Sequence, residues 1–142
     1  MEIRSFRARD QGSVIELWRA CDLVRPWNDP VRDIERKVAV GDGLLIVGVL
    51  DAAVVATVMA GYEGHRGWIN YLAVHPDRQR QGLGRSLMHE AELRLRGLGC
   101  PKINLQVRTS NPDAIAFYER LGFAVDDAVS LGKRLVADDE RG

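Results

Sequence analysis

The stretch HPDRQRQGLGRSLM, residues 75–88, decides how the rest of the sequence can fold. Gly82 and Gly84 stand one residue apart in it, and an apolar segment with helical spacing follows them. A turn of this kind at the start of a helix leaves backbone N–H groups without an intrahelical acceptor. These donors and the helix dipole favour an anion such as phosphate. The stretch also carries three arginines that could approach such an anion: Arg78, Arg80 and Arg85.

Two familiar phosphate-binding motifs do not fit this spacing. A dinucleotide fingerprint would need a third glycine at position 87, which is a leucine, and a βαβ context. A P-loop would need four residues between its glycines, followed by Lys and then Ser or Thr. The motif alone therefore leaves two interpretations open, a phosphate site or a plain glycine turn that enters an amphipathic helix.

Before this stretch, the sequence predicts two helices and a set of neighbouring strands. Asp10 can cap a helix whose apolar residues follow at i, i+3, i+4 and i+7, and Asp29 with Pro30 is a typical start of a second helix. Short turns between the apolar, β-branched runs predict an antiparallel meander. The predicted strands are MEIRSF (1–6), LLIVGVL (44–50), AVVATVMAG (53–61) and WINYLAV (68–74).

After the glycines, helices and strands are expected to alternate. Apolar residues recur at helical spacing from Leu83 to Leu98, and Asn111 with Pro112 predicts the start of another helix. Three strands are expected, at KINLQVR (102–108), FAV (123–125) and VSLGKRL (129–135). The complete order predicts an α/β (α+β) fold in one domain, residues 1–142, with a mixed, mostly antiparallel sheet flanked by about four helices.

The composition restricts the partners that we expect. Lys plus Arg and Asp plus Glu number 20 each, so no overall field would attract nucleic acid or an anionic membrane. The sequence has neither a signal-peptide pattern nor an apolar run long enough to span a bilayer, and we expect a cytoplasmic protein. Cys21 and Cys100 fit no metal or redox spacing and are expected to be small buried side chains, without a metal site.

Two segments carry a resemblance to a known family. QRQGLG (79–84) resembles the Q/R-x-x-G-x-G/A motif of the GCN5-related N-acetyltransferase (GNAT) superfamily, and NPDAIAFYERLGF (111–123) resembles its asparagine-to-tyrosine helix. CDLVRPWNDPVRDIERK (21–37) is similar to the small YpeA-like bacterial branch. The resemblance implies the GNAT acyl-CoA N-acyltransferase fold and direct transfer of an acetyl group from acetyl-CoA, as cosubstrate, to a primary amine.

The same resemblance implies roles for individual residues. Tyr118 matches the tyrosine that protonates the departing coenzyme thiolate as general acid, and Asn111 both caps its helix and contacts the coenzyme. The pantetheine is expected along the strand edge formed by Leu72, Ala73 and Val74, where its amides can pair with the main chain. The pyrophosphate is expected on the turn formed by Gln79, Arg80, Gln81, Gly82, Leu83, Gly84 and Arg85.

The base and the acceptor are less well defined by the sequence. The strand positions that often hold a Glu or His in the family are Trp68 and Asn70 here, and neither can take a proton. Glu63 is the tentative base, with His65 or solvent as substitutes. The acceptor, a small-molecule or peptide amine, is expected beside Trp27, Asn28 and Asn70. The missing strand base keeps open an acyl-CoA-binding module without turnover, and the last strand could also exchange in a homodimer.

Overall fold

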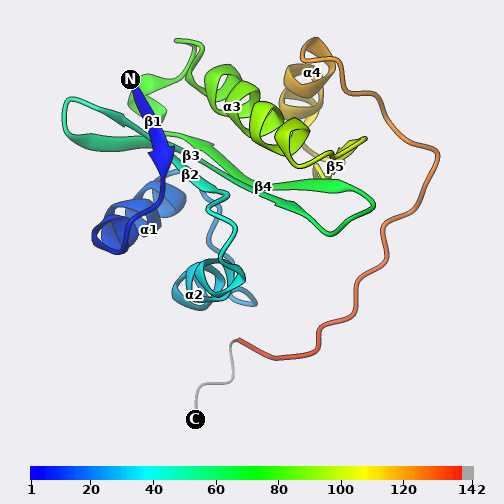
Figure 1. Ribbon diagram of the computed structural model, residues 1–142, viewed down its shortest axis with the longest axis horizontal. Helices are drawn as coiled ribbons and strands as arrows, with labels where there is room; N and C mark the ends of the chain where they lie inside the picture. The colour runs from blue at the N-terminus through cyan, green and yellow to red at the C-terminus, as the bar shows by residue number, and fades with distance from the viewer. Residues whose placement is uncertain (139–142) are drawn as a thin grey trace.

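The structure, a computed structural model, describes residues 1–138. This part of the chain contains five strands and four α-helices, with two short 3-10 helices, η1 (Ala8–Asp10) and η2 (Pro76–Arg78) (Figure 1). The strands are β1 (Glu2–Ser5), β2 (Leu45–Leu50), β3 (Ala53–Tyr62), β4 (Gly67–Val74) and β5 (Ile103–Leu105). The α-helices are α1 (Gln11–Ala20), α2 (Pro30–Val40), α3 (Leu83–Gly97) and α4 (Pro112–Arg120).

The strands form one sheet in the order β1-β2-β3-β4-β5. Strands β2, β3 and β4 are antiparallel neighbours, as the meander predicts. Strand β1 adds to β2 in antiparallel orientation, and β5 joins β4 in parallel. The parallel pairing covers only three residues of β4, from Gly67 opposite Ile103 to Ile69 opposite Leu105. Because β4 continues to Val74, its second half has no strand on the β5 side. The sheet therefore opens between these two strands.

Helices cover both faces of the sheet, with α1 and α2 on one face and α3 and α4 on the other (Figure 1). Strand β2 is buried on both sides, which explains its unbroken apolar run. Its Ile46 packs with Leu87 and Leu95 of α3, whereas Val47 packs with Trp18 of α1. The predicted α/β (α+β) architecture with a mostly antiparallel sheet is confirmed. No helix of residues 1–138 is long and apolar enough to cross a membrane.

The three predicted N-cap residues do precede helices, and two of them cap their helix with the side chain. The Asp29 carboxylate accepts a hydrogen bond from the Val31 N–H, and the Asn111 side chain accepts one from the Ala114 N–H. The prediction that Asp10 caps α1 with its side chain is wrong. Its carboxylate instead accepts hydrogen bonds from the Arg4 guanidinium, at 2.7 and 3.0 Å, and from the Arg7 N–H. A charged partner within reach outcompetes the helix end for this carboxylate.

The predictions for the last three strands need correction. The strand expected at residues 102–108 is limited to Ile103–Leu105, and the strands expected at 123–125 and 129–135 are absent from the described structure. Residues 123–138 instead run as an irregular segment from α4 to the start of α2 (Figure 1). A strand needs a partner's backbone groups, and β5 offers only three residues. Side chains make the contacts here, as between Asn104 and Asp126 at 2.7 Å.

Candidate active site

The glycine turn has the backbone shape that the sequence predicts. Gly82 is the N-cap of α3 with φ of 77°, and Arg80 two residues earlier has φ of 65°. The Ser86 N–H makes the first bond of the helix, to the Gly82 carbonyl at 3.1 Å. The N–H groups of Leu83, Gly84 and Arg85 therefore have no intrahelical acceptor. They and the left-handed residues before them form a concave set of donors suited to an anion.

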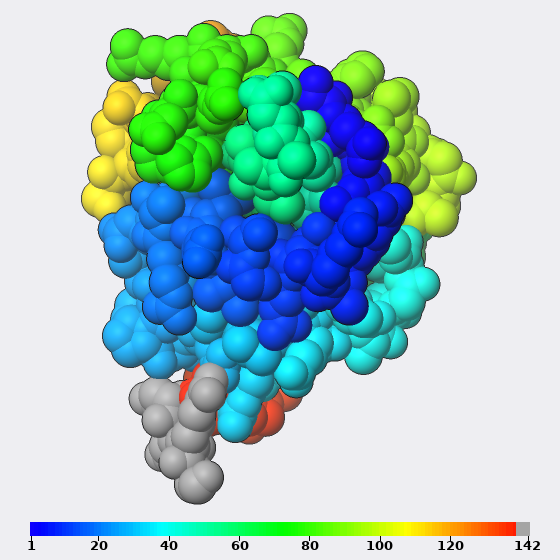
Figure 2. Space-filling model, turned by 90° about the vertical axis from the view of Figure 1, so that its left-hand side faces the viewer, coloured from blue at the N-terminus to red at the C-terminus, as the bar shows by residue number. Residues whose placement is uncertain are grey.

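The two glycines of the turn have different functions. Gly82 needs the left-handed conformation, although the space around it is open. Gly84 has ordinary helical backbone, but a Cβ there would lie 3.5 Å from the Phe117 ring and 3.5 Å from Val74. These are ordinary van der Waals distances, so the start of α3 packs closely against α4 and Val74. In the space-filling view, the green segment around residue 80 lies next to the yellow segment near residue 110, which leads into α4 (Figure 2).

The second half of β4 faces the gap between β4 and β5. The His75 N–H donates to the Val55 carbonyl of β3, and backbone groups of successive residues point to opposite neighbours, so those of Val74 face the gap. The Val74 carbonyl accepts from the Gln79 side-chain amide and from the Cys21 thiol, both at 3.2 Å. Leu72 and Val74 are partly buried against the α3 side, and Ala73 packs toward α1. The three residues predicted for the pantetheine therefore lie next to the turn.

A bulge that the sequence did not reveal bends β4 at this position. Between the pairs Thr57–Ala73 and Met59–Asn70, β4 has two residues where β3 has one. Tyr71 adopts φ of 50°, which is unusual for a tyrosine. Its carbonyl accepts a 2.9 Å bond from the Thr57 hydroxyl. Bulges of this kind increase the local twist and redirect a strand, which accounts for the opening toward β5.

Tyr118 lies on α4, one residue after Phe117. Its ring makes edge contacts with Phe117 and Phe123, at centroid distances of 5.1 and 5.7 Å. Burial raises the pKa of Tyr118 to about 12, so the phenol keeps its proton at neutral pH. Because the Phe117 ring lies beside the Gly84 position, this helix packs next to the glycine turn.

The charged and amide side chains of the turn are mostly exposed. Gln79, Arg80, Gln81 and Arg85 all face solvent. Arg78 lies 3.5 Å from Asp51, whereas Arg80 and Arg85 make no ion pair within residues 1–138. Both side chains are therefore available to a ligand on the turn.

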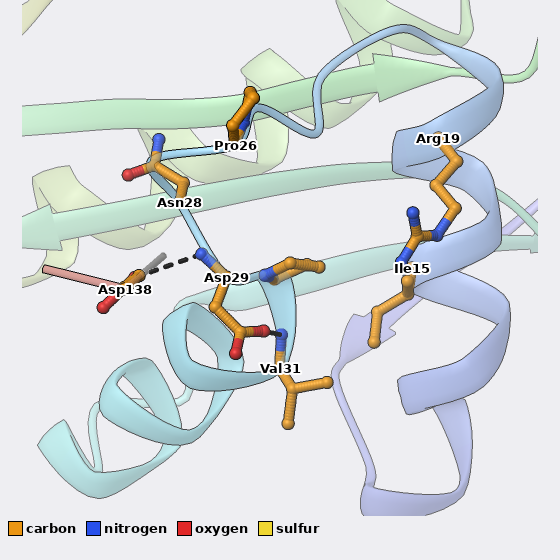
Figure 3. A pocket seen from close by; sticks show the side chains of 8 residues that line it. Ile15, Arg19, Pro26, Asn28, Asp29, Val31 and Asp138 are labelled. Carbon is orange, nitrogen blue, oxygen red and sulfur yellow. Dashed lines mark hydrogen bonds between the residues drawn. The ribbon is translucent and has the colours of Figure 1, made fainter. Parts of the chain in front are cut away.

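The residues predicted for the acceptor do not form one cluster. Trp27 is 46% exposed and lies under the Arg108 guanidinium, 6.0 Å from the ring centroid. Asn70 is exposed on β4 opposite Met59. Asn28 borders a separate hollow of about 490 Å³ between α1 and the start of α2 (Figure 3). The hollow is lined by Ile15, Arg19, Pro26, Asn28, Asp29, Pro30, Val31 and Asp138.

The geometry above agrees with one protein family. The sequence model of the acetyltransferase (GNAT) family matches residues 12–123, which include strands β2 to β5, the glycine turn and α4. The chain belongs to the GNAT family. As a GNAT protein it is an N-acetyltransferase, and the expectation from the two motifs is confirmed at this level.

Solved structures support the GNAT assignment. The ribosomal-protein-S18-alanine N-acetyltransferase from Escherichia coli is 29% identical, with a TM-score of 0.69 over 85% of this chain and 76% of that one. Ard1 from Thermoplasma volcanium is 25% identical, with a TM-score of 0.76 over 88% and 83% of the two chains. PaiA N-acetyltransferase from Thermoplasma acidophilum, solved with coenzyme A, is 18% identical, with a TM-score of 0.76 over 90% and 92%. The last likeness shows the shared GNAT fold.

Glu63 of this GNAT chain lies in the hairpin between β3 and β4. Its carboxylate accepts hydrogen bonds from the backbone N–H groups of Arg66 and His65. These bonds, that of Arg66 above all, lower the pKa of Glu63 below its usual range. Glu63 precedes β4 while the glycine turn follows it, so the two lie beyond opposite ends of this strand. Within residues 1–138, no group of three or more His, Cys, Asp or Glu side chains is arranged to hold a metal ion.

Proposed function

We propose that this protein transfers the acetyl group of acetyl-CoA directly to a primary amine. The observation that supports the proposal is the packing of the Phe117 ring beside Gly84, because the helix that carries Tyr118 then lies next to a set of unpaired backbone donors. The coenzyme A named for the PaiA structure supports this choice of cosubstrate, since the two proteins share a fold.

The residues of the opening fit the coenzyme. The turn from Gln79 to Arg85 presents N–H groups and two unpaired arginines to a pyrophosphate, which is the anion that such a helix start favours. Leu72, Ala73 and Val74 present the backbone of β4 to the amides of pantetheine, as in the addition of a strand to a sheet edge. Asn111 at the start of α4 is the proposed side-chain contact.

When bound, the coenzyme supplies a thioester, which is an activated acetyl donor. Tyr118 then holds a proton next to the departing sulfur and acts as general acid. A phenol with a pKa of about 12 is protonated at neutral pH, so it is ready to donate. The apolar contacts of its ring with Phe117 and Phe123 fix the direction of the hydroxyl.

The acceptor amine must lose a proton, and the chain offers no imidazole or carboxylate at positions 68 and 70 of β4. Glu63 stays the proposed base, with solvent as the alternative. Its two backbone hydrogen bonds weaken it, because they stabilise the charged form. This chemistry makes the acceptor's own protonation state the main control of the rate near neutral pH.

The experiment that tests the function has two measurements. Calorimetry with acetyl-CoA reports whether the opening binds the coenzyme, and a thiol-release assay with a panel of small amines and peptides reports turnover. Binding and release together support the proposal. Binding without release on any acceptor would favour an acyl-CoA-binding module, and no binding at all would remove the assignment of the opening. The YpeA-like branch and a homodimer remain predictions from the sequence.

A further inference from the structure

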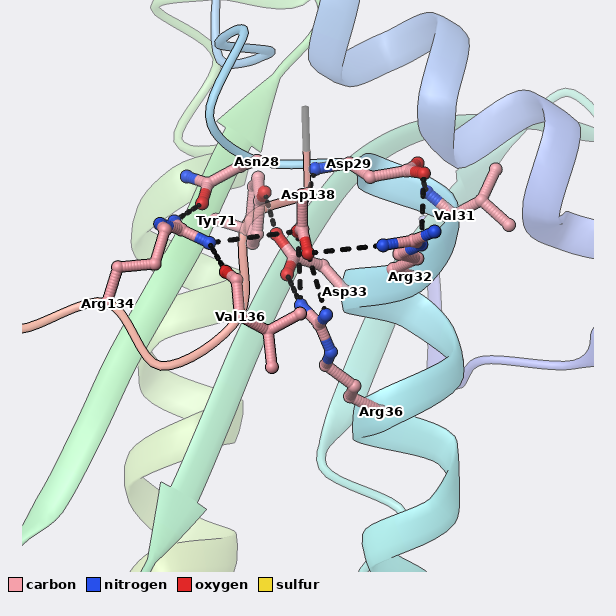
Figure 4. Close-up of polar contacts among 10 residues, drawn as sticks. All are labelled: Asn28, Asp29, Val31, Arg32, Asp33, Arg36, Tyr71, Arg134, Val136 and Asp138. Carbon is pink, nitrogen blue, oxygen red and sulfur yellow. Dashed lines mark hydrogen bonds and ion pairs between the residues drawn. The ribbon is translucent and has the colours of Figure 1, made fainter. Parts of the chain in front are cut away.

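The carboxylate of Asp138 is held by an unusual number of donors for a residue at the end of an irregular segment (Figure 4). The Arg36 guanidinium binds both of its oxygens, at 2.7 and 3.1 Å, and the Asp29 N–H donates to it at 3.1 Å. Arg32 and Arg134 add guanidinium groups at 3.8 and 3.9 Å. The Asp138 side chain is fully buried by these groups.

The segment that leads to Asp138 does not itself pack onto the protein. Four of its apolar side chains are between 82% and 91% exposed, namely Val125, Val129, Leu131 and Leu135, and Val136 is 56% exposed. Its other side-chain contacts lie near β5, where Asp126 meets Lys102 and Asn104 and Ser130 meets Gln106. Close to Asp138, the Arg134 guanidinium also donates to the Asn28 side-chain oxygen, at 2.5 Å. The arginines of α2 therefore bind Asp138 through its carboxylate, as a binding site binds a ligand. Residues 123–137 act as the tether that links this carboxylate to α4.

The carboxylate lies close to the bulge of β4. The Tyr71 hydroxyl donates to the Asp33 carboxylate at 2.6 Å, and Asp33 lies 3.5 Å from the same Arg36 that binds Asp138. Tyr71 directly precedes Leu72, the first residue of the proposed pantetheine edge. Asp138 also lines the hollow beside Asn28 (Figure 3). Contacts from Tyr71 to Asp33 and from Asp33 to Arg36 thus connect the part of β4 beside Leu72 with the arginines of α2.

We propose that Arg32, Arg36 and the Asp29 amide form a carboxylate site for the acceptor, and that Asp138 occupies this site in the free protein. The acceptor is then a small amine that also bears a carboxylate, such as an amino acid or a short peptide. Arg134 belongs to the tether and leaves with Asp138 when the acceptor binds. This inference rests on the proposed acetyl transfer, whose acceptor it defines.

The binding test uses Asp138→Asn, which keeps the shape of the side chain and removes its charge. Glutarate should raise the melting temperature of this variant, and it should have no such effect once Arg36→Gln is added. Asp42→Asn is the matched control, because it removes a carboxylate from a different ion pair, with Lys37. No stabilisation of a folded Asp138→Asn variant by glutarate would overturn the proposal, whether or not acetyl-CoA binds.

A second measurement uses the unaltered chain and so does not depend on the folding of a variant. If glutarate displaces Asp138, trypsin should cut faster after Lys133, at constant ionic strength set with chloride. An unchanged cleavage rate at saturating glutarate would count against the site. Acetyl-CoA calorimetry, run in parallel, tests the proposed function separately, because glutarate binding needs no coenzyme.

The kinetic test compares alanylalanine with its C-terminal amide, which differ by one carboxylate. Asp138→Asn should lower KM for the free dipeptide by about tenfold, the size of one charged hydrogen bond, and leave KM for the amide unchanged. Equal use of the two dipeptides by the parent chain and by the variant would overturn the proposal.

Discussion

The ring of Tyr71 stacks on the ring of Trp18, with centroids 3.8 Å apart and planes at 11°. The same two residues are joined a second time through Thr57, whose hydroxyl accepts from the Trp18 indole N–H at 3.0 Å and donates to the Tyr71 carbonyl at 2.9 Å. Helix α1 therefore holds the bulge of β4 in place. Since the bulge opens the sheet toward β5, the opening depends on a helix on the other face.

Thr57→Val should destabilise the fold and weaken coenzyme binding. The substitution leaves the Trp18 N–H and the Tyr71 carbonyl without a partner, and each such buried group costs about 1–3 kcal/mol. Urea unfolding gives the free energy, and calorimetry gives the affinity for acetyl-CoA. Thr57→Ser retains the hydroxyl and serves as the control. Equal stability of the Val and Ser variants would show that these bonds do not hold the bulge.

Gly82→Ala should reduce affinity for acetyl-CoA more than it reduces stability. Alanine at a φ of 77° costs roughly 1–2 kcal/mol, and relief of that strain would turn the N–H groups of the turn away from the anion. Gly12→Ala is the matched control, because Gly12 lies on α1 in open space with ordinary φ. Calorimetry and thermal unfolding of both variants test this. If the Gly82 variant bound acetyl-CoA normally, the pyrophosphate would not sit on this turn.

Tyr118→Phe should lower kcat by about 10²–10⁴-fold, the usual contribution of a positioned general acid. KM for acetyl-CoA should change little, since the ring and its contacts remain. The parent enzyme should lose no activity from Tyr118 ionisation until the pH nears about 12, because burial keeps the phenol protonated. Tyr62→Phe, which removes a hydroxyl bonded to the Gly64 carbonyl, is the control. A kcat as high as that of the control would exclude Tyr118 as the acid.

Glu63→Gln tests the proposed base through the pH profile. Because the pKa of Glu63 is lowered, its basic form is present above that pKa and is lost only as the pH falls through the lowered value. The variant should acetylate amines more slowly at neutral pH than the parent chain, and the difference should shrink at high pH, where the amine deprotonates unaided. Two profiles of the same shape would remove Glu63 from the mechanism and leave solvent as the base.

The sequence predicted what depends on local pattern. The runs of β2, β3 and β4, the caps at Asp29 and Asn111 and the glycine turn all involve residues close together in the chain, and the structure contains them. The bulge at Tyr71 carries no Gly or Pro to mark it, because distant partners on α1 and β3 hold it.

The final segment was mispredicted for a related reason. The alternation in residues 129–135 is typical of a strand. Such a strand would need β5 as its partner, and β5 has only three residues, a length that the local pattern did not predict. The carboxylate of Asp138 and its main partner Arg36 are 102 positions apart, so no local motif could join them. The sequence thus predicted the shape of the glycine turn but not the contacts of Asp138.

The donors of the turn at Gly82 belong to the main chain, and this has a consequence for how the protein can diverge. Amide hydrogens do not titrate in the range where proteins stay folded, and proline is the one replacement that deletes them. Related proteins could replace Gln79, Gln81 or Arg85 and still bind the proposed pyrophosphate, provided that residue 82 keeps its left-handed backbone conformation. Selection should therefore act more strongly on the backbone conformation of this turn than on the identity of its side chains.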